Sequence, residues 1–206
     1  EQNNFVTIGH HSHTHDYLID KSHEEFIADI EIANKIFLKE LGYVPPLFSY
    51  PFGEYSKLMK NYISENFILS FGQHSGVIDL NKEKFELPRF PINEKYGELK
   101  RFKSLTKTLP LKYKNLFPLE KYLSKEKNPP KVKIEFLNSI KNINQINCYS
   151  NEGNTWRNSK VIFNSEKNIE ILLVDKFIGE RGRINCSLRE KNGFWRWLGI
   201  QFVIAE

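Results

Sequence analysis

The chain has 206 residues, of which 40% are hydrophobic, so it can bury a core and does not have the composition of a disordered protein. No apolar run reaches the roughly 18 residues that a membrane-spanning helix needs, so we expect no membrane span. The net charge of +5 is uneven. Residues 1–110 hold 13 Lys and Arg against 15 Asp and Glu, whereas residues 111–206 hold 17 against 10, which is a first indication of two domains.

The basic second half could meet an anionic polymer, but a lysine-rich solvated surface accounts for the same charge. It contains neither an Arg-rich helix nor the interleaved aromatic motif of an RNA-binding sheet. We therefore expect no nucleic-acid partner.

The first half alternates predicted strands and helices. Residues 5–9 form a β-branched run that ends in Gly, which is typical of a strand. A helix is predicted over residues 22–43, because Ser22 and Glu25 have capping-box spacing and apolar residues follow every three to four positions. The next predicted elements are a short strand in 45–53, a helix over 54–66, a strand over 67–72, an extended segment over 87–93 and a helix over 96–109. Such alternation predicts a parallel sheet or a barrel of β/α units, whose chemistry lies in the loops after the strands.

The second half has a different pattern. Residues 110–130 contain four prolines and little periodicity, so we predict a linker there. Six short apolar or alternating runs follow at roughly ten-residue spacing, separated by turn residues. They predict a small β-sandwich over residues 131–206.

The two cysteines, Cys148 and Cys186, both lie in this second half, and no C-x-x-C pair is present. They are either two buried thiols or one disulfide. A disulfide would stabilise the domain by on the order of 4 kcal/mol and would indicate an oxidising compartment.

The three tryptophans also lie there, at positions 156, 195 and 197. Trp195 and Trp197 share one face of a predicted strand, so this face either belongs to the sandwich core or stacks on sugar rings.

Four of the six histidines fall within residues 10–15. Ligands of one zinc must place their nitrogens about 2.0–2.1 Å from the metal. In a strand, residues four apart are about 13 Å apart, so His11 and His15 can share a metal only if the chain turns directly after Gly9. The alternative is a His-rich loop without a metal.

The residues around these histidines favour the metal site. His11, Ser12 and His15 match H-[ST]-x-x-H, and "SYPFG" at 49–53, "FGQHSGVID" at 71–79 and "LPRFP" at 87–91 follow in that order. Together these motifs resemble the polysaccharide deacetylases of the NodB-homology type, carbohydrate esterase family 4. The resemblance implies an α/β fold, a partial distorted (β/α) barrel over residues 1–109. The C-terminal β-domain is similar to a domain appended in one branch of these proteins.

The resemblance further implies a divalent metal, usually zinc, on an Asp–His–His triad with His11 and His15 as the histidine ligands. The implied activity is metal-dependent removal of N-acetyl groups from a polysaccharide, in the periplasm or outside the cell. Residues 1–10 contain no aspartate, so the family's Asp-Asp motif is missing, and we expect the chain to begin after it. The alternative is a carbohydrate-binding protein that kept the fold and lost the chemistry.

Other residues take their expected roles from the same motifs. The N–H of Phe52 is the candidate oxyanion donor, and its ring, with His13 and Tyr50, is predicted to line the sugar site. Ser49 replaces the family's arginine, and we hypothesise that Arg89 supplies the lost charge; the alternative is a surface arginine paired with Glu86 or Glu94. His74 is the candidate general acid, or else an ordinary loop histidine.

Overall fold

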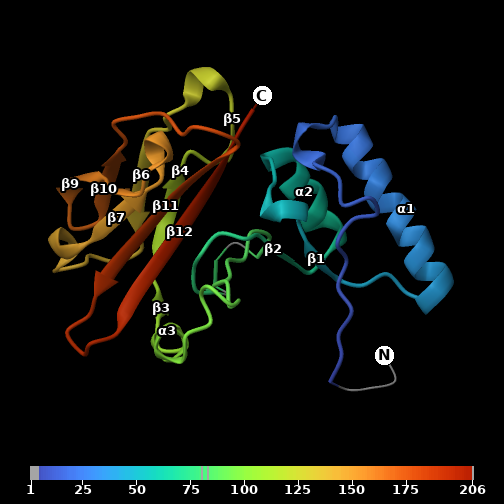
Figure 1. Cartoon of the computed structure of the whole chain (residues 1–206), viewed down its shortest axis with the longest axis horizontal. Helices are drawn as coiled ribbons and strands as arrows, with labels where there is room; N and C mark the ends of the chain where they lie inside the picture. The colour runs from blue at the N-terminus through green and yellow to red at the C-terminus, as the bar shows by residue number, and fades with distance from the viewer. Residues whose placement is uncertain (1–4, 80, 83, 206) are drawn as a thin grey trace. The chain divides into compact units, whose positions relative to one another are not determined.

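The computed structural model describes residues 5–79, 81–82 and 84–205, and the chain divides into two compact units (Figure 1). Unit 1 comprises residues 1–73 and 80–87, and unit 2 comprises residues 74–79 and 88–206. The predicted boundary at residue 109 therefore lies inside unit 2.

Unit 1 has mixed α/β structure. Its elements are η1 (Leu18–Asp20), α1 (His23–Leu41), β1 (Leu47–Ser49), η2 (Pro51–Gly53), α2 (Lys57–Asn66) and β2 (Leu69–Phe71). Strands β1 and β2 pair in parallel. They form a two-stranded sheet, and the described part of unit 1 contains no closed barrel.

The strand predicted at residues 5–9 is not formed. Within residues 5–10, His10 alone pairs with β1, as an isolated parallel bridge to Phe48. Phe5 and Val6 are exposed, so the β-branched run alone does not make a strand.

Capping residues define both ends of helix α1. The Ser22 side chain accepts from the Glu25 N–H and the Glu25 side chain accepts from the Ser22 N–H, so the predicted capping box is confirmed. Gly42 ends the helix with φ at 80° and donates its N–H to Leu38, because glycine adopts this left-handed conformation at little cost. The buried face of the helix carries Phe26, Ile30 and Ala33, together with one carboxylate, Asp29.

Unit 2 consists mainly of strands. Its elements are α3 (Leu99–Leu105), β3 (Leu109–Pro110), β4 (Tyr113–Phe117), β5 (Tyr122–Leu123), η3 (Lys125–Lys127), β6 (Val132–Phe136), η4 (Ile143–Gln145), β7 (Asn147–Ser150), η5 (Glu152–Asn154), β8 (Arg157–Asn158), β9 (Lys160–Ser165), β10 (Asn168–Leu172), β11 (Arg181–Arg189) and β12 (Trp195–Ile204). One sheet has the order β4-β6-β10-β9. The other has the order β3-β12-β11-β7-β8, with β5 also paired to β12.

The two sheets of unit 2 share one hydrophobic core. Alternate residues of β6 and β10 pack against alternate residues of β7, β11 and β12 in a single cluster, so the layers are arranged like a sandwich (Figure 1). All six predicted runs contain strands. The unit is not all-β, however, because α3 belongs to it.

The predicted linker over residues 110–130 is wrong. Strand β4 pairs with β6 and strand β5 pairs with β12, so this segment contributes to both sheets. Leu111, Leu116 and Leu123 are buried in the core. Its prolines hide the strand pattern because they lie between these short strands or at their ends.

Cys148 and Cys186 form a disulfide between β7 and β11, where they lie directly opposite each other. Both are fully buried. The bond closes a loop with a sequence separation of 38, which is worth about 4 kcal/mol by the chain-entropy estimate.

Among the described residues, no helix combines the length and the apolar character needed to cross a bilayer.

Candidate functional site

The histidine loop of unit 1 starts from a buried anchor, His10. Its N–H donates to the Leu47 carbonyl at 2.7 Å and its carbonyl accepts from the Ser49 N–H at 2.9 Å, so the loop leaves from the edge of β1. Its ring is 1% exposed and packs against Phe37, Phe48 and Phe67 at 5.1, 5.4 and 5.2 Å between ring centroids. His10 is therefore a structural residue.

Burial lowers the pKa of His10 to about 4, although the nearby Asp29 carboxylate and the Asn34 side chain act in the opposite direction. The Ser12 N–H donates to Nδ1 of His10 at 3.2 Å. The neutral ring therefore carries its proton on Nε2.

The chain turns directly after His10, as a shared metal site requires. Ser12 and His15 have positive φ angles of 64° and 57°, which are costly for residues with a Cβ. The His15 N–H donates to the Ser12 hydroxyl at 3.1 Å. The Ser12 side chain thus stabilises a strained turn in the backbone of the histidine motif.

Asp29 of α1 stabilises the same turn through hydrogen bonds. Its carboxylate accepts from the His13 N–H at 2.8 Å, from the Thr14 N–H at 3.1 Å and from the Thr14 hydroxyl at 2.7 Å. Asp29 is not among the residues predicted for the site from the sequence. The available signal was a carboxylate on the apolar face of a helix, three residues after Phe26 and four before Ala33.

The turn brings His11 and His15 together. Their rings lie 4.8 Å apart between centroids and meet edge to face. Nδ1 of His11 lies 2.7 Å from the Ser49 carbonyl oxygen. A carbonyl can only accept, so Nδ1 carries the proton and Nε2 keeps its lone pair.

Phe52 completes this cluster. Its ring lies 4.9 Å from His15 and 5.5 Å from Tyr17, measured between centroids. Phe52 has a φ of 57°, and the φ of the next residue, Gly53, is 70°. A Cβ on Gly53 would lie 2.4 Å from the backbone N of Gln73, so only glycine fits this turn. The "SYPFG" motif therefore places an aromatic ring beside the two histidines.

Tyr50 does not belong to the site surface, and the prediction that it binds substrate is wrong. It is fully buried, and its hydroxyl donates to the Phe85 carbonyl at 3.1 Å and accepts from the Ser70 hydroxyl at 3.2 Å. Its ring packs against Phe48 and Tyr55 at 5.2 and 4.8 Å between centroids.

The donor set at His11 and His15 fits two ligand positions of a divalent metal. Both side chains are exposed, and the carbonyl bonded to Nδ1 of His11 is the kind of partner that orients a metal-binding imidazole. Among the residues that the structure describes, no group of three His, Cys, Asp or Glu side chains could hold a metal ion. The third ligand that the motif implies is therefore not found among them.

The remaining predicted site residues lie elsewhere or make other contacts. The side chain of His13 is exposed while its backbone is held by Asp29. His74 and Arg89 belong to unit 2, where the Arg89 N–H donates to the His74 carbonyl at 3.0 Å. Of the two alternative partners for Arg89, Glu86 bonds Lys60 at 3.1 Å and Tyr55 at 2.9 Å. The roles of His74 and Arg89 stay predictions.

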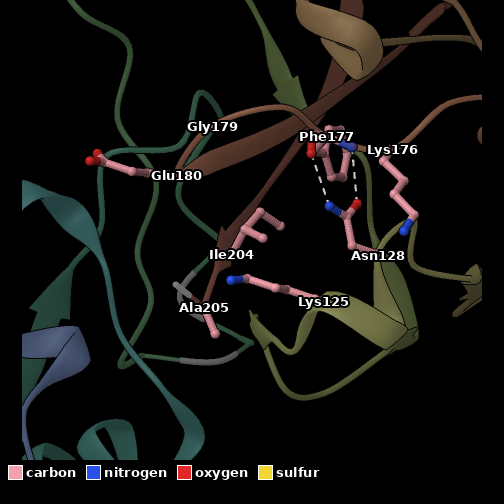
Figure 2. Close-up of a pocket in the computed structure, with 8 residues that line it drawn as sticks. All are labelled: Lys125, Asn128, Lys176, Phe177, Gly179, Glu180, Ile204 and Ala205. Atoms are coloured by element: carbon pink, nitrogen blue, oxygen red, sulfur yellow. Dashed lines mark hydrogen bonds between the residues drawn. The ribbon is translucent and has the colours of Figure 1, made fainter.

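Unit 2 has a hollow of about 420 Å³ where the end of β12 meets the segment around Phe177 (Figure 2). The Asn128 amide is fully engaged there, because it donates to the Phe177 carbonyl and accepts from the Phe177 N–H, both at 2.9 Å. Figure 2 shows Glu180 and Lys176 at opposite ends of the hollow, so its charged groups do not converge.

The chain was compared with known proteins and families. No curated protein matches it. The family model described as polysaccharide deacetylase matches residues 1–67, a range that holds the histidine turn, α1, β1, the "SYPFG" turn and α2. Over residues 1–67 the chain is therefore similar to the polysaccharide deacetylase family.

Proposed function

We propose that this chain is part of a metal-dependent hydrolase that removes N-acetyl groups from a polysaccharide. The observation that carries the proposal is the cluster of His11, His15 and Phe52, which two turns within residues 1–67 bring together. Within the proposal, unit 1 is a part of a NodB-type barrel.

In this proposal His11 and His15 hold a divalent metal, zinc in the first instance. When bound, such a metal acts as a Lewis acid toward the acetamide carbonyl and lowers the pKa of its water. The Phe52 ring offers an apolar face to the sugar, and its backbone N–H is the proposed donor to the oxyanion. His13 borders the sugar. His74 is proposed to protonate the leaving amine and Arg89 to hold the catalytic carboxylate ionised.

We also propose that the protein works in the periplasm or outside the cell. The disulfide between Cys148 and Cys186 supports this, because such bonds persist mainly in oxidising compartments.

The test is acetate release from a chito-oligosaccharide by the protein expressed with whatever sequence its gene places before residue 1. We expect His11→Ala and His15→Ala each to lower kcat/KM by at least a hundredfold, because a metal held by one fewer imidazole is bound weakly and badly oriented. The matched control is His23→Ala, which removes an imidazole from the start of α1 and should leave the rate within twofold.

Two outcomes would contradict the proposal. One is acetate release that does not respond to His11→Ala or to a chelator. The other is retained binding of the oligosaccharide without any release, which would favour the alternative of a carbohydrate-binding protein on a degenerate deacetylase fold.

A further inference from the structure

A second hollow of unit 2 lies between the tip of the β11–β12 hairpin and the end of α3. It measures about 260 Å³ and is lined by Ser104, Lys107, Asn192, Gly193, Phe194 and Trp195. Phe194 and Trp195 are each 39% exposed, so Trp195 is not the core residue that one reading of the sequence allowed.

The hairpin tip that carries these aromatics is well ordered by its own hydrogen bonds. The Glu190 N–H donates to the Phe194 carbonyl at 2.8 Å, and the Gly193 N–H donates to the Glu190 carbonyl at 3.0 Å. The Phe194 N–H donates to Oδ1 of Asn192 at 3.1 Å, and Gly193 has a φ of 85°. The hollow is therefore preformed on this side, and binding there would cost little ordering entropy.

The opposite wall comes from the C-terminal end of α3. The Lys107 N–H donates to the Ser104 carbonyl at 3.2 Å, which closes the turn at the end of α3, and both residues line the hollow opposite the hairpin. The hollow thus combines two aromatic rings, a hydroxyl, an amide and one ammonium.

The one charged residue that lines the hollow is a cation, Lys107. No carboxylate is among its lining residues, and the nearby Glu190 is bonded to Arg196. The Arg189 guanidinium lies 6.0 Å from the Trp195 ring centroid. Unit 2 as a whole contains 23 Lys and Arg against 13 Asp and Glu. A negatively charged ligand is therefore favoured here.

We propose that this hollow binds one acidic sugar residue of a polysaccharide chain. The flat face of Trp195 would pack on the C–H face of the pyranose ring, the Lys107 ammonium would pair with the sugar carboxylate, and Ser104 and Asn192 would bond its hydroxyls. The choice of a polysaccharide rests on the proposed function. A single-stranded nucleic acid also stacks on aromatic rings, but it needs a row of cations along its backbone, and Lys107 is the one cation among the lining residues.

The test is a titration of the intact chain with three probes in the presence of a chelator, followed by NMR and by tryptophan fluorescence. The probes are a hyaluronan oligosaccharide, which alternates glucuronic acid and N-acetylglucosamine, a neutral chito-oligosaccharide and a single-stranded oligonucleotide. We expect the acidic oligosaccharide to bind at least threefold tighter than the neutral one. Equal binding of the two would overturn the acidic specificity.

Variants then locate the site. Trp195→Ala should weaken binding of the acidic probe about tenfold, and Trp195→Leu should weaken it as much, because leucine restores apolar bulk without a flat face. Lys107→Ala should weaken it about fivefold at low salt, with a smaller effect at high salt. The matched controls are Trp156→Ala, which removes an exposed tryptophan elsewhere, and Lys103→Ala, which removes one charge from the neighbouring helix α3; both should stay within twofold.

Three results would overturn the proposal: control variants as harmful as the site variants, no binding of the acidic probe at millimolar concentration, or tighter binding of the oligonucleotide that depends on Trp195. Failure of the proposed function can be distinguished from failure of this binding proposal. His11→Ala and the chelator should abolish deacetylation and leave binding at this hollow unchanged, so loss of one result does not imply loss of the other.

Discussion

The two units keep their backbones in place by different means. In unit 1 the histidine turn is held by single polar side chains, chiefly Asp29 and Ser12, which stabilise residues in strained conformations. In unit 2 long strand ladders and one disulfide hold the chain, and the side chains that could bind a ligand lie at a hairpin tip. Unit 1 should thus respond to changes of single polar groups, whereas unit 2 should depend on its covalent link.

The disulfide gives the largest expected difference. Replacing both cysteines, Cys148→Ala with Cys186→Ala, should lower the free energy of unfolding of unit 2 by about 4 kcal/mol, because the unfolded chain regains the freedom of the closed loop. All three tryptophans lie in unit 2, so denaturant unfolding followed by tryptophan fluorescence reports on this unit alone. A loss of unfolding free energy below about 1 kcal/mol would show that the strand ladders stabilise unit 2 without the disulfide.

The buried His10 should make unit 1 sensitive to acid. Its folded pKa of about 4 lies below the usual 6.5, so the unfolded chain binds the additional proton first as the pH falls. Stability from this group is therefore complete above about pH 6.5 and declines between pH 6.5 and 4, by on the order of 3 kcal/mol in total.

The measurement for His10 is denaturant unfolding at several pH values with a chelator present, followed by circular dichroism of α1 and α2. The charged groups that act on the ring are Asp29 and His11. His10→Asn offers an acceptor to the Ser12 N–H without a titrating ring, so it should flatten the slope in this window. An unchanged slope would mean that other groups cause the acid sensitivity.

Asp29 tests the role of single polar side chains in unit 1. Asp29→Ala removes three hydrogen bonds to the turn and should cost about 2–3 kcal/mol of stability, since each contributes about 0.5–1.5 kcal/mol. It should also weaken zinc binding about tenfold or more, because the turn that pairs His11 with His15 loosens.

A matched control for Asp29 is Glu40→Ala, which removes one carboxylate from the same helix. Glu40 pairs with Lys39 at 3.2 Å and both side chains are exposed, so the loss of this pair should cost less than about 0.5 kcal/mol. Equal effects of the two variants would show that helix charge, and not the turn, is at work.

The sequence predicted most of unit 2 because alternation of apolar residues carries the strand signal. The six runs of unit 2 follow from such local patterns, as does helix α1 of unit 1 with its capping box. The pairing of Cys148 with Cys186 was left open because it joins strands distant in the chain. The strands of segment 110–130 were not predicted, because β4 and β5 are short and gain their stability from partners distant in the chain.

The candidate site was predictable to the extent that a motif fixes its residues. H-[ST]-x-x-H marked His11 and His15, and the glycine of "SYPFG" marked the turn at Phe52. Tyr50 was misassigned because a motif does not tell which of its side chains faces inward. Asp29 was missed because two of its three partners are backbone N–H groups, which leave no trace in the sequence.

The central claim is that His11 and His15 together hold a divalent metal, and zinc binding measured by isothermal titration calorimetry tests it most directly. We predict one weak site in the chain as given, since two ligands rarely make a tight site, and its loss in His11→Ala and in His15→Ala. His13→Ala, a change within the same turn, should keep the site. Zinc binding that persists in His11→Ala and in His15→Ala, or that disappears only in His13→Ala, would contradict this claim.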